Sequence, residues 1–499
     1  MRRSWRGVPR TVVTIALAGA LALAACGTPS VSNPGFHPAP ATHDYPQFGY
    51  DAARSGDNTA ETTLSRANLG QMTKLWQIAL PGVADSSPIL LHALPFPDGP
   101  RDVLYVTTRD GRLLALDARD GSLLWQRQPR GIKITHSSPV ADPSRMYVYA
   151  YGLDGYVHRY NAITGAEATG AGWPARITLM TTTEKESSAL NIANGRLYVT
   201  TSGYIGDATP YQGHVVTVDL QSGEEHIFNT LCSNLTHLLR PGECASQRSG
   251  DWARGGAVID PTNGDIFTAT GNGPFNADSG GADYGDSILA LSPDGSRLLD
   301  SFTPDNYHYL DVTDLDLGSM APALLPRVAA SATPLMLVQG GKDGRLRLIN
   351  RQNMSGRGGP GHQGGELQTI VTSCRYYHQP AVWTDHASGQ PWIAISNSCG
   401  LATYRLVTSA SGVSRLQQVW GDSAARVTSL VYANGALYGA ESGAVRAWDA
   451  SDGARLWGSD TASAGGSIGG IHWESPIVVG GALYISDENG ALTCYGLKS

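Results

Sequence analysis

Short runs of alternating apolar and polar residues recur along most of the chain. Each unit has a small polar start, an apolar strand, a glycine turn, an alternating strand and then the pattern Asp-x-x-x-Gly before a last strand. The second strands are the clearest, and eight are expected, at 103–107, 146–150, 197–201, 266–270, 335–340, 392–396, 436–440 and 482–486. Such regular self-similarity predicts a repeat architecture, either a propeller or a solenoid.

The two ends of the repeat pattern complement each other. The last unit shows only three strands, whereas an unassigned strand at 74–78 (KLWQI) precedes the first unit. It contains a tryptophan, as do the fourth strands near Trp125, Trp420 and Trp457. Donating this strand to the last unit would remove exposed strand edges, and an open solenoid would need capping units. The sequence predicts an all-β, eight-bladed β-propeller of four-stranded antiparallel blades, its last blade closed by the N-terminal strand.

The beginning of the chain has the pattern of an export signal. Arginines precede an apolar run at 11–25, which is shorter than the ~20 residues of a membrane span. Small residues then precede Cys26, which resembles the lipoprotein box whose cysteine is lipidated. We expect a signal peptide at 1–25, a tether at 26–43 and the propeller at 44–499. The protein would be exported and anchored to a cell-envelope membrane; a cleaved signal with an incidental cysteine is the alternative.

Composition and cysteine spacing narrow the picture further. Only 16% of the residues are charged and the formal net charge is -7, which excludes a basic nucleic-acid-binding surface. Export permits disulfides. Cys232 and Cys244 bracket a polar loop and Cys374 and Cys399 flank a hairpin-sized region, so these are candidate pairs, although spacing does not fix the connectivity. Cys494 lies in an alternating strand and is expected to be a buried free thiol.

Two sequence patterns resemble a known family. Residues 116–125 (LDARDGSLLW) resemble the PQQ-type (pyrroloquinoline quinone) propeller repeat. The segments 45–49 (YPQFG), 64–69 (LSRANL) and 75–76 (LW) are similar to the start of quinoprotein dehydrogenase propellers. The resemblance covers about residues 44–497 and implies the propeller fold. Members of the family are either quinoprotein alcohol dehydrogenases or cofactor-free scaffolds, such as the lipoprotein of the outer-membrane β-barrel assembly machinery.

The resemblance also implies roles for four polar side chains. Quinoprotein oxidation needs a calcium-polarised orthoquinone, a carboxylate base and a cation near the quinone oxygens. By match to the family's segments, Asn272 would bind calcium and Asp314 would be the catalytic base beside the metal. Asp316 is a neighbouring candidate catalytic carboxylate, and Lys342 would supply the cation to PQQ. Turn formation at Asn272 and Lys342, and a solvated acidic loop, are the structural alternatives.

The chain departs from the enzyme pattern at several positions. The tryptophan that forms the floor under the quinone is replaced by Arg254, and Trp252 stands two residues early, so both are candidate cofactor contacts. A calcium-binding glutamate expected near 202–205 is missing, with Asp207 as a candidate substitute. No adjacent cysteine pair and no Cys-x-x-Cys-His haem motif is present. Four histidines lack metal-ligand spacing and are expected to be hydrogen-bonded or exposed: His136, His214, His378 and His472.

These observations favour a monomeric, lipid-anchored binding or scaffold propeller with a degenerate quinoprotein site. Its funnel would take an envelope protein or a small-molecule ligand, and neither PQQ nor calcium would be required. The alternative is a PQQ- and calcium-dependent quinoprotein alcohol dehydrogenase that passes electrons to an external acceptor. Asn272, Asp314 and Lys342 lie in neighbouring units, so their loops are expected to converge on one axial mouth in either case.

Overall fold

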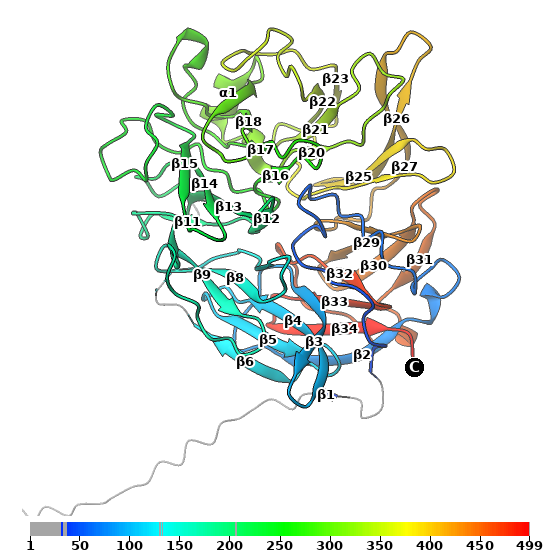
Figure 1. Cartoon of the computed structure of the whole chain (residues 1–499). Coiled ribbons are helices and arrows are strands. Elements are labelled where there is room, and N and C mark those ends of the chain that lie inside the picture. The colour runs from blue at the N-terminus through cyan, green and yellow to red at the C-terminus, as the bar shows by residue number, and fades with distance from the viewer. Residues whose placement is uncertain (1–30, 33–36, 129–130, 132, 205–206, 499) are drawn as a thin grey trace, which may run out of the picture.

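The described part of the chain is a ring of eight antiparallel β-sheets around a central axis (Figure 1). The computed structural model describes residues 31–32, 37–128, 131, 133–204 and 207–498, so the expected signal segment and Cys26 lie outside it. No helix among these residues is both long and apolar enough to cross a membrane. The eight-bladed propeller predicted from the repeats is confirmed.

Seven of the sheets take their strands from one sequence unit each, in chain order, and the eighth combines the last unit with N-terminal strands. The first four blades contain β3 (Ile89–Phe96), β4 (Gly99–Thr107), β5 (Leu113–Asp117) and β6 (Leu123–Arg127); β7 (Val140–Ala141), β8 (Tyr147–Gly152), β9 (Tyr156–Asn161) and β10 (Ala175–Arg176); β12 (Asn191–Ala193), β13 (Arg196–Gly203), β14 (His214–Asp219) and β15 (Glu225–Asn229); and β16 (Val258–Ile259), β17 (Ile266–Ala269), β18 (Ile288–Leu291) and β19 (Leu298–Phe302). A short strand, β11 (Glu184–Glu186), also pairs with β13 in the third blade.

The remaining blades repeat this arrangement. They contain β20 (Ala323–Leu324), β21 (Met336–Gly340), β22 (Arg345–Asn350) and β23 (Gln368–Val371); β24 (Ala381–Thr384), β25 (Pro391–Asn397), β26 (Gly400–Thr408) and β27 (Ser414–Asp422); β28 (Val431–Ala433), β29 (Ala436–Glu441), β30 (Ala444–Asp449) and β31 (Arg455–Gly458); and β32 (Ile477–Val479), β33 (Ala482–Ser486) and β34 (Ala491–Gly496). The helices are α1 (Tyr307–Thr313), η1 (Leu69–Gln71), η2 (Ala277–Ser279), η3 (Leu317–Ser319) and η4 (Ala462–Ala464).

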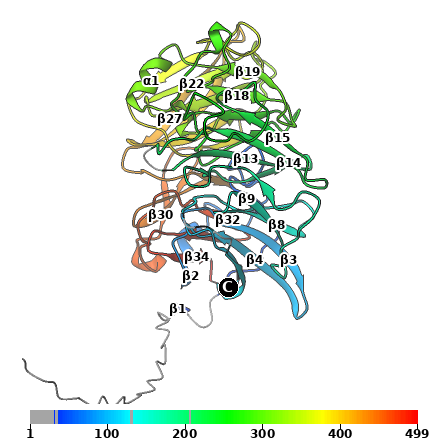
Figure 2. The same ribbon diagram turned by 90° about the vertical axis from the view of Figure 1, so that its left-hand side faces the viewer.

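The N-terminal strand closes the last blade, as the sequence predicted. Strand β2 (Thr73–Ala79) pairs antiparallel with β34, so that Trp76 lies opposite Cys494. The blue β2 and the red β34 lie side by side in Figure 1 and again in the perpendicular view of Figure 2. A two-residue strand, β1 (Val31–Ser32), pairs with the outer side of β2, within the segment expected to be a tether. Closure therefore gives every blade of the ring its outer strand.

The recurring tryptophan and glycine join neighbouring blades. Trp125 on the fourth strand of the first blade donates its indole N–H to the carbonyl of Ala162 in the next blade, over 3.0 Å. Gly165 of that blade has a φ of +66°, and a Cβ there would lie 2.6 Å from the Trp125 ring. Trp76 and Trp420 make the same indole bond to the next blade. The Asp-x-x-x-Gly turn, in which Asn161 replaces the Asp in the second blade, thus forms the surface on which the preceding blade's tryptophan packs.

Two disulfides fix loops at the edge of this framework. Cys232 pairs with Cys244, and Cys374 with Cys399, as the spacing suggested. Cys494 is the free cysteine among the described residues and is buried in β34, also as predicted. Apolar packing between blades supplies the rest of the core; Leu104 of β4, for example, belongs to one buried cluster with Leu492 of β34.

Candidate functional site

A cavity of about 350 Å³ lies where the loops of several blades meet. In an antiparallel blade, the loop after the second strand and the loop to the next blade emerge at the same end, so these loops surround one mouth. Asn272 and Lys342 belong to the first kind of loop, and Trp252, Asp314 and Asp316 to the second. All five line the cavity, so the structure brings the sequence-predicted residues together.

Lys342 binds both of the candidate catalytic carboxylates. Its Nζ lies 3.0 Å from Oδ1 of Asp314 and forms a second ion pair with Oδ2 of Asp316. The two acids differ in environment, because the Asp314 side chain is 69% exposed and that of Asp316 only 4%. Burial raises the pKa of Asp316, which Lys342 opposes. Against the effect of burial, the two carboxylates raise the pKa of Lys342, so it is an ammonium at neutral pH.

Asn272 is held by the same buried carboxylate. Its backbone N–H donates to Oδ1 of Asp316 over 2.6 Å. The side-chain amide of Asn272 is oriented so that both of its polar atoms are paired. Its Nδ2 donates to Asp316 Oδ1 at 2.9 Å, and its Oδ1 accepts from the Arg248 guanidinium at 3.2 Å. Gly271 is required here because a Cβ would lie 2.5 Å from Asp316 Oδ1. The Gly-Asn segment therefore packs its backbone directly against the acid.

Aromatic rings form one wall of the cavity. Trp252 and Trp473 meet edge to face with ring centres 6.2 Å apart. The ammonium of Lys342 lies over the Trp252 ring, 5.2 Å from its centre, within range of a cation–π contact. Trp252 thus presents its ring beside the acid–lysine cluster, two residues before the position at which the sequence comparison expects the floor tryptophan. Arg254, at that position, lines the same cavity and donates to the backbone carbonyl of Ser187.

A third basic side chain, Lys185, which sequence reasoning missed, lines the cavity near Arg254. Lys185 is fully buried, and burial lowers its pKa to about 7. Its Nζ donates to Oγ of Ser187 over 2.7 Å, and that hydroxyl lies 2.8 Å from Oγ of Ser202. Lys185 is one of only five lysines in the chain, which is the one sequence signal that would have drawn attention to it. With Arg254 it makes this part of the cavity suited to an anionic group.

Two of the histidines expected to be isolated meet at one carboxylate. His136 and His472 place their Nδ1 atoms 2.7 and 2.8 Å from Oδ2 of Asp85, and both line the cavity. Burial lowers the pKa of His136 to about 4, which Asp85 opposes. Against the effect of burial, the two imidazoles hold the pKa of Asp85 well below its usual range. No spacing along the chain signals this cluster, because its members come from three separate blades.

The other predicted residues have local partners. His214 is buried against Glu184, with Nε2 2.8 Å from Oε1. His378 is half-buried, with its ring centre 5.6 Å from that of Trp473, and its Nδ1 has no hydrogen-bond partner among the described residues. Asp207, the proposed substitute for the missing glutamate, lines the cavity and accepts from the hydroxyl of Tyr211 at 2.7 Å.

The oxygen atoms around Asp316 do not fit a calcium ion in this arrangement. Calcium takes six to eight oxygen ligands, mostly carboxylates and carbonyls. Here the carboxylate of Asp316 already accepts from Lys342 and Asn272, and the Asn272 oxygen accepts from Arg248. An ammonium therefore stands among the acids where a metal would have to bind. The aromatic wall and the three cations, in contrast, fit a planar anionic molecule such as PQQ.

Comparison with known sequences identifies related proteins. A PQQ-type repeat model, whose description is outer membrane protein assembly factor BamB, matches residues 59–267. Quinohemoprotein alcohol dehydrogenase ADH IIB of Pseudomonas putida is 26% identical over 293 residues, 53% of this chain and 40% of that protein. The ADH-IIG enzyme of the same organism is 26% identical over 175 residues, 32% of this chain and 22% of that protein. The chain thus spans less than half the length of these curated relatives.

Solved structures show the same architecture. The quinohemoprotein alcohol dehydrogenase of Comamonas testosteroni superposes with a TM-score of 0.61 at 14% identity, covering 92% of this chain and 81% of that one. A europium-containing methanol dehydrogenase superposes with a TM-score of 0.63 at 13% identity, covering 91% and 98%. At these identities the similarity concerns the fold alone.

Proposed function

Because this chain belongs to the PQQ-type β-propeller family, we propose that it is a lipid-anchored, extracytoplasmic binding protein whose axial cavity holds a small planar anion. The site descends from the quinoprotein arrangement and has lost its metal-dependent chemistry. The same fold carries different functions in different proteins, so the side chains of the site decide between them.

One observation carries this proposal. The ammonium of Lys342 bridges Asp314, which the family resemblance implies as base and metal residue, and Asp316, the neighbouring candidate catalytic carboxylate. An internal cation in contact with both acids offsets part of their negative charge without a metal. The Asp314 carboxylate, which would have to accept the substrate's proton, is then occupied by the Lys342 ammonium. We therefore assign no proton transfer to Asp314.

The class of ligand follows from the rest of the cavity. Trp252 and Trp473 offer apolar ring faces and edges, and Lys185 and Arg254 offer donors and positive charge. Small-molecule sites typically occupy about 300–1,000 Å³, and this cavity of about 350 Å³ falls at the lower end of that range. A compact aromatic carboxylate fits both the size and the charge.

A second candidate function is PQQ- and calcium-dependent alcohol oxidation with an external electron acceptor. It is favoured by the convergence of Asn272, Asp314, Asp316 and Lys342 beside one tryptophan, in the order that the family resemblance implies. In that case Lys342 would have to release Asp316 when a metal binds.

Calorimetry and a dye-reduction assay on the full chain separate the two functions. PQQ, as an aromatic tricarboxylate, is titrated in EDTA and again in excess calcium. We expect PQQ to bind with equal affinity in both conditions, and we expect no alcohol-dependent dye reduction. The Lys185→Met variant should bind PQQ about tenfold or more weakly, because a charge-assisted hydrogen bond is removed. Lys74→Met, on the outer strand β2, is the control and should bind normally.

Each opposite result has a definite meaning. Binding that requires calcium, together with alcohol-dependent dye reduction, would establish the dehydrogenase instead. No heat with PQQ or with a smaller aromatic dicarboxylate would refute a small-anion site.

Membrane anchoring is tested separately at Cys26. A Cys26→Ser chain expressed with its signal should leave the detergent phase and become soluble in the extracytoplasmic fraction, because it lacks the acylated sulfur. The measurement is detergent phase partitioning of both forms. Equal partitioning of the two would refute lipidation.

A further inference from the structure

Three loops from different blades bring two imidazoles and a buried carboxylate to one point. Asp85 precedes β3, His136 precedes β7 and His472 precedes β32, so they enter blades one, two and eight. One nitrogen of each histidine and one oxygen of Asp85 all lie within 4.8 Å of one another. The Asp85 side chain is fully buried, whereas His472 is exposed toward the cavity.

The neighbouring carboxylate of Glu474 is buried, and one of its oxygens has no hydrogen-bond partner among the described residues. Glu474 is fully buried, and one of its oxygens accepts from the backbone N–H of His472 over 2.7 Å. Its other oxygen, Oε1, has no hydrogen-bond partner among the described residues. The carboxylates of Asp85, Glu474 and Glu488 also lie within 4.8 Å of one another. A buried, unpaired carboxylate oxygen is costly unless a cation or donor satisfies it.

We propose that Asp85, His136 and His472 bind a divalent transition metal of the zinc class, with Glu474 as a further ligand. Each imidazole would supply the Nδ1 lone pair and keep its single proton on Nε2. Two imidazole nitrogens and carboxylate oxygens are the donor set of catalytic zinc and of related transition metals. Because both histidines line the cavity, the remaining coordination position faces the space where a small molecule would lie.

Three basic side chains lie around this cluster: Arg109, and also Lys185 and Arg254, which act electrostatically on both His136 and Asp85. Within the described part of the chain, Arg109 is the one guanidinium paired with Asp85, at 3.0 Å, and it also forms an ion pair with Glu488. If a metal takes Oδ2 of Asp85, Arg109 retains Glu488 as a partner. A calcium ion would be the poorer occupant, since it prefers oxygen ligands to imidazole nitrogen. This site is separate from the cluster of Lys342, Asp314 and Asp316.

Metal binding here would also join the two ends of the ring. His472 stands at the start of the blade that β2 completes, and Asp85 stands between β2 and the first blade. A shared metal would therefore connect blades eight, one and two across the point of closure. Binding to the folded chain alone raises the midpoint of thermal unfolding.

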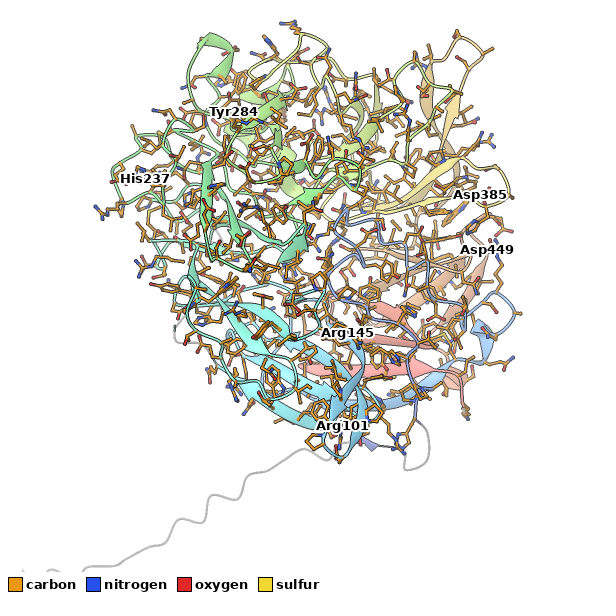
Figure 3. The ribbon with its side chains drawn as sticks, in the orientation of Figure 1. Arg101, Arg145, His237, Tyr284, Asp385 and Asp449 are labelled. Carbon is orange, nitrogen blue, oxygen red and sulfur yellow. A yellow bond between two sulfur atoms is a disulfide. The ribbon has the colours of Figure 1, made fainter. Side chains whose placement is uncertain are left out.

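The test uses zinc as the probe on EDTA-treated full chain. Calorimetry with zinc chloride is expected to give one site per chain, with affinity reduced at least tenfold in His136→Ala and in His472→Ala. Cobalt(II) should show visible absorption bands from the same site, and zinc should raise the thermal midpoint of the wild type but not of His136→Ala or His472→Ala. His237→Ala is the matched control: this histidine is 3.4 Å from Glu243, and Figure 3 places it at the outer edge of the ring.

A further variant guards against loss of folding. Arg109→Gln removes the competing cation and should tighten zinc binding while leaving both histidines in place. Wild-type protein that binds no zinc, or that binds it equally well after loss of both histidines, would overturn the site. Stronger binding of calcium than of zinc would likewise overturn the assignment, as would weaker zinc binding in a folded Arg109→Gln variant.

Discussion

Buried ionisable side chains in the interior of the ring differ in how many hydrogen-bond partners reach them. Arg54 is fully buried, and its guanidinium donates to four backbone carbonyls, including those of Phe48 and Gly255. Asp251 has no such compensation, since both of its carboxylate oxygens lack partners among the described residues. Burial, together with Glu186, raises the pKa of Asp251 well above its usual range. Burial therefore favours the protonated form of this acid in the folded protein.

The raised pKa of Asp251 predicts that the free energy of unfolding falls as the pH rises, and that replacing the carboxyl group by an amide removes this loss. The folded-state pKa lies above the unfolded value of 3.8, so the folded state holds more protons and stability falls as pH rises through that window. Asp251→Asn should match the wild type near pH 4 and exceed it at pH 7. The difference should grow by at most about 1.4 kcal/mol per pH unit within the window. Thermal unfolding midpoints of both proteins from pH 4 to 8 measure it; parallel curves would contradict the protonated acid.

At the scale of the blade, one glycine and one tryptophan define the contact between neighbours. Gly453 closes an Asp-x-x-x-Gly turn at a φ of +78°, and a Cβ there would lie 2.6 Å from the Trp420 ring of the preceding blade. Trp420 in turn donates to the carbonyl of Ala450 over 2.9 Å. The repeat motif therefore combines a backbone requirement with a packing requirement.

Two glycine substitutions distinguish the backbone requirement from the packing requirement. Gly443 has a φ of +91°, but among the described residues no atom lies within 4 Å of the place that a Cβ would take, so Gly443→Ala reports the backbone cost alone. Gly453→Ala should lower the free energy of unfolding by about 1–3 kcal/mol more, because the methyl group also displaces the tryptophan. Thermal or denaturant unfolding of the two variants measures this difference. Equal losses would show that the ring contact does not contribute.

At the scale of the whole molecule, the ring depends on pairing between segments from opposite ends of the chain. Strand β2 supplies the outer strand of the blade that β32, β33 and β34 begin. Leu75 and Trp76 of β2 are buried in the cluster that links the eighth and first blades. Loss of this strand would expose the edge of β34 along its length.

Deleting residues 73–79 is expected to open the ring. The protein should associate through the free edge of β34 and unfold at a lower temperature, because an exposed strand edge pairs with other chains. Size-exclusion chromatography and thermal unfolding measure both effects. A chain that lacks only residues 1–36 keeps β2 and serves as the control. A monomeric deletion variant with an unchanged midpoint would contradict closure by β2.

The repeat, the number of blades and the closing strand were all predictable from the amino-acid sequence, which also marked the two candidate cysteine pairs. These features are local, since alternation, turn glycines and short cysteine spacings are set within a few tens of residues. It also identified Asn272, Asp314, Asp316, Lys342 and Trp252 as candidates through motif resemblance.

The way in which charged side chains combine around the axis depends on contacts between blades, which the sequence pattern does not reveal. Lys342 and Asp316 are separated in sequence, and their ion pair, which opposes a metal at the quinoprotein position, depends on the convergence of two loops. Asp85 and His472 lie 387 residues apart and meet because blades eight and one are neighbours in the closed ring. Such contacts carry no local periodicity, and for this reason the buried Lys185 and the histidine cluster emerged only once the ring was formed.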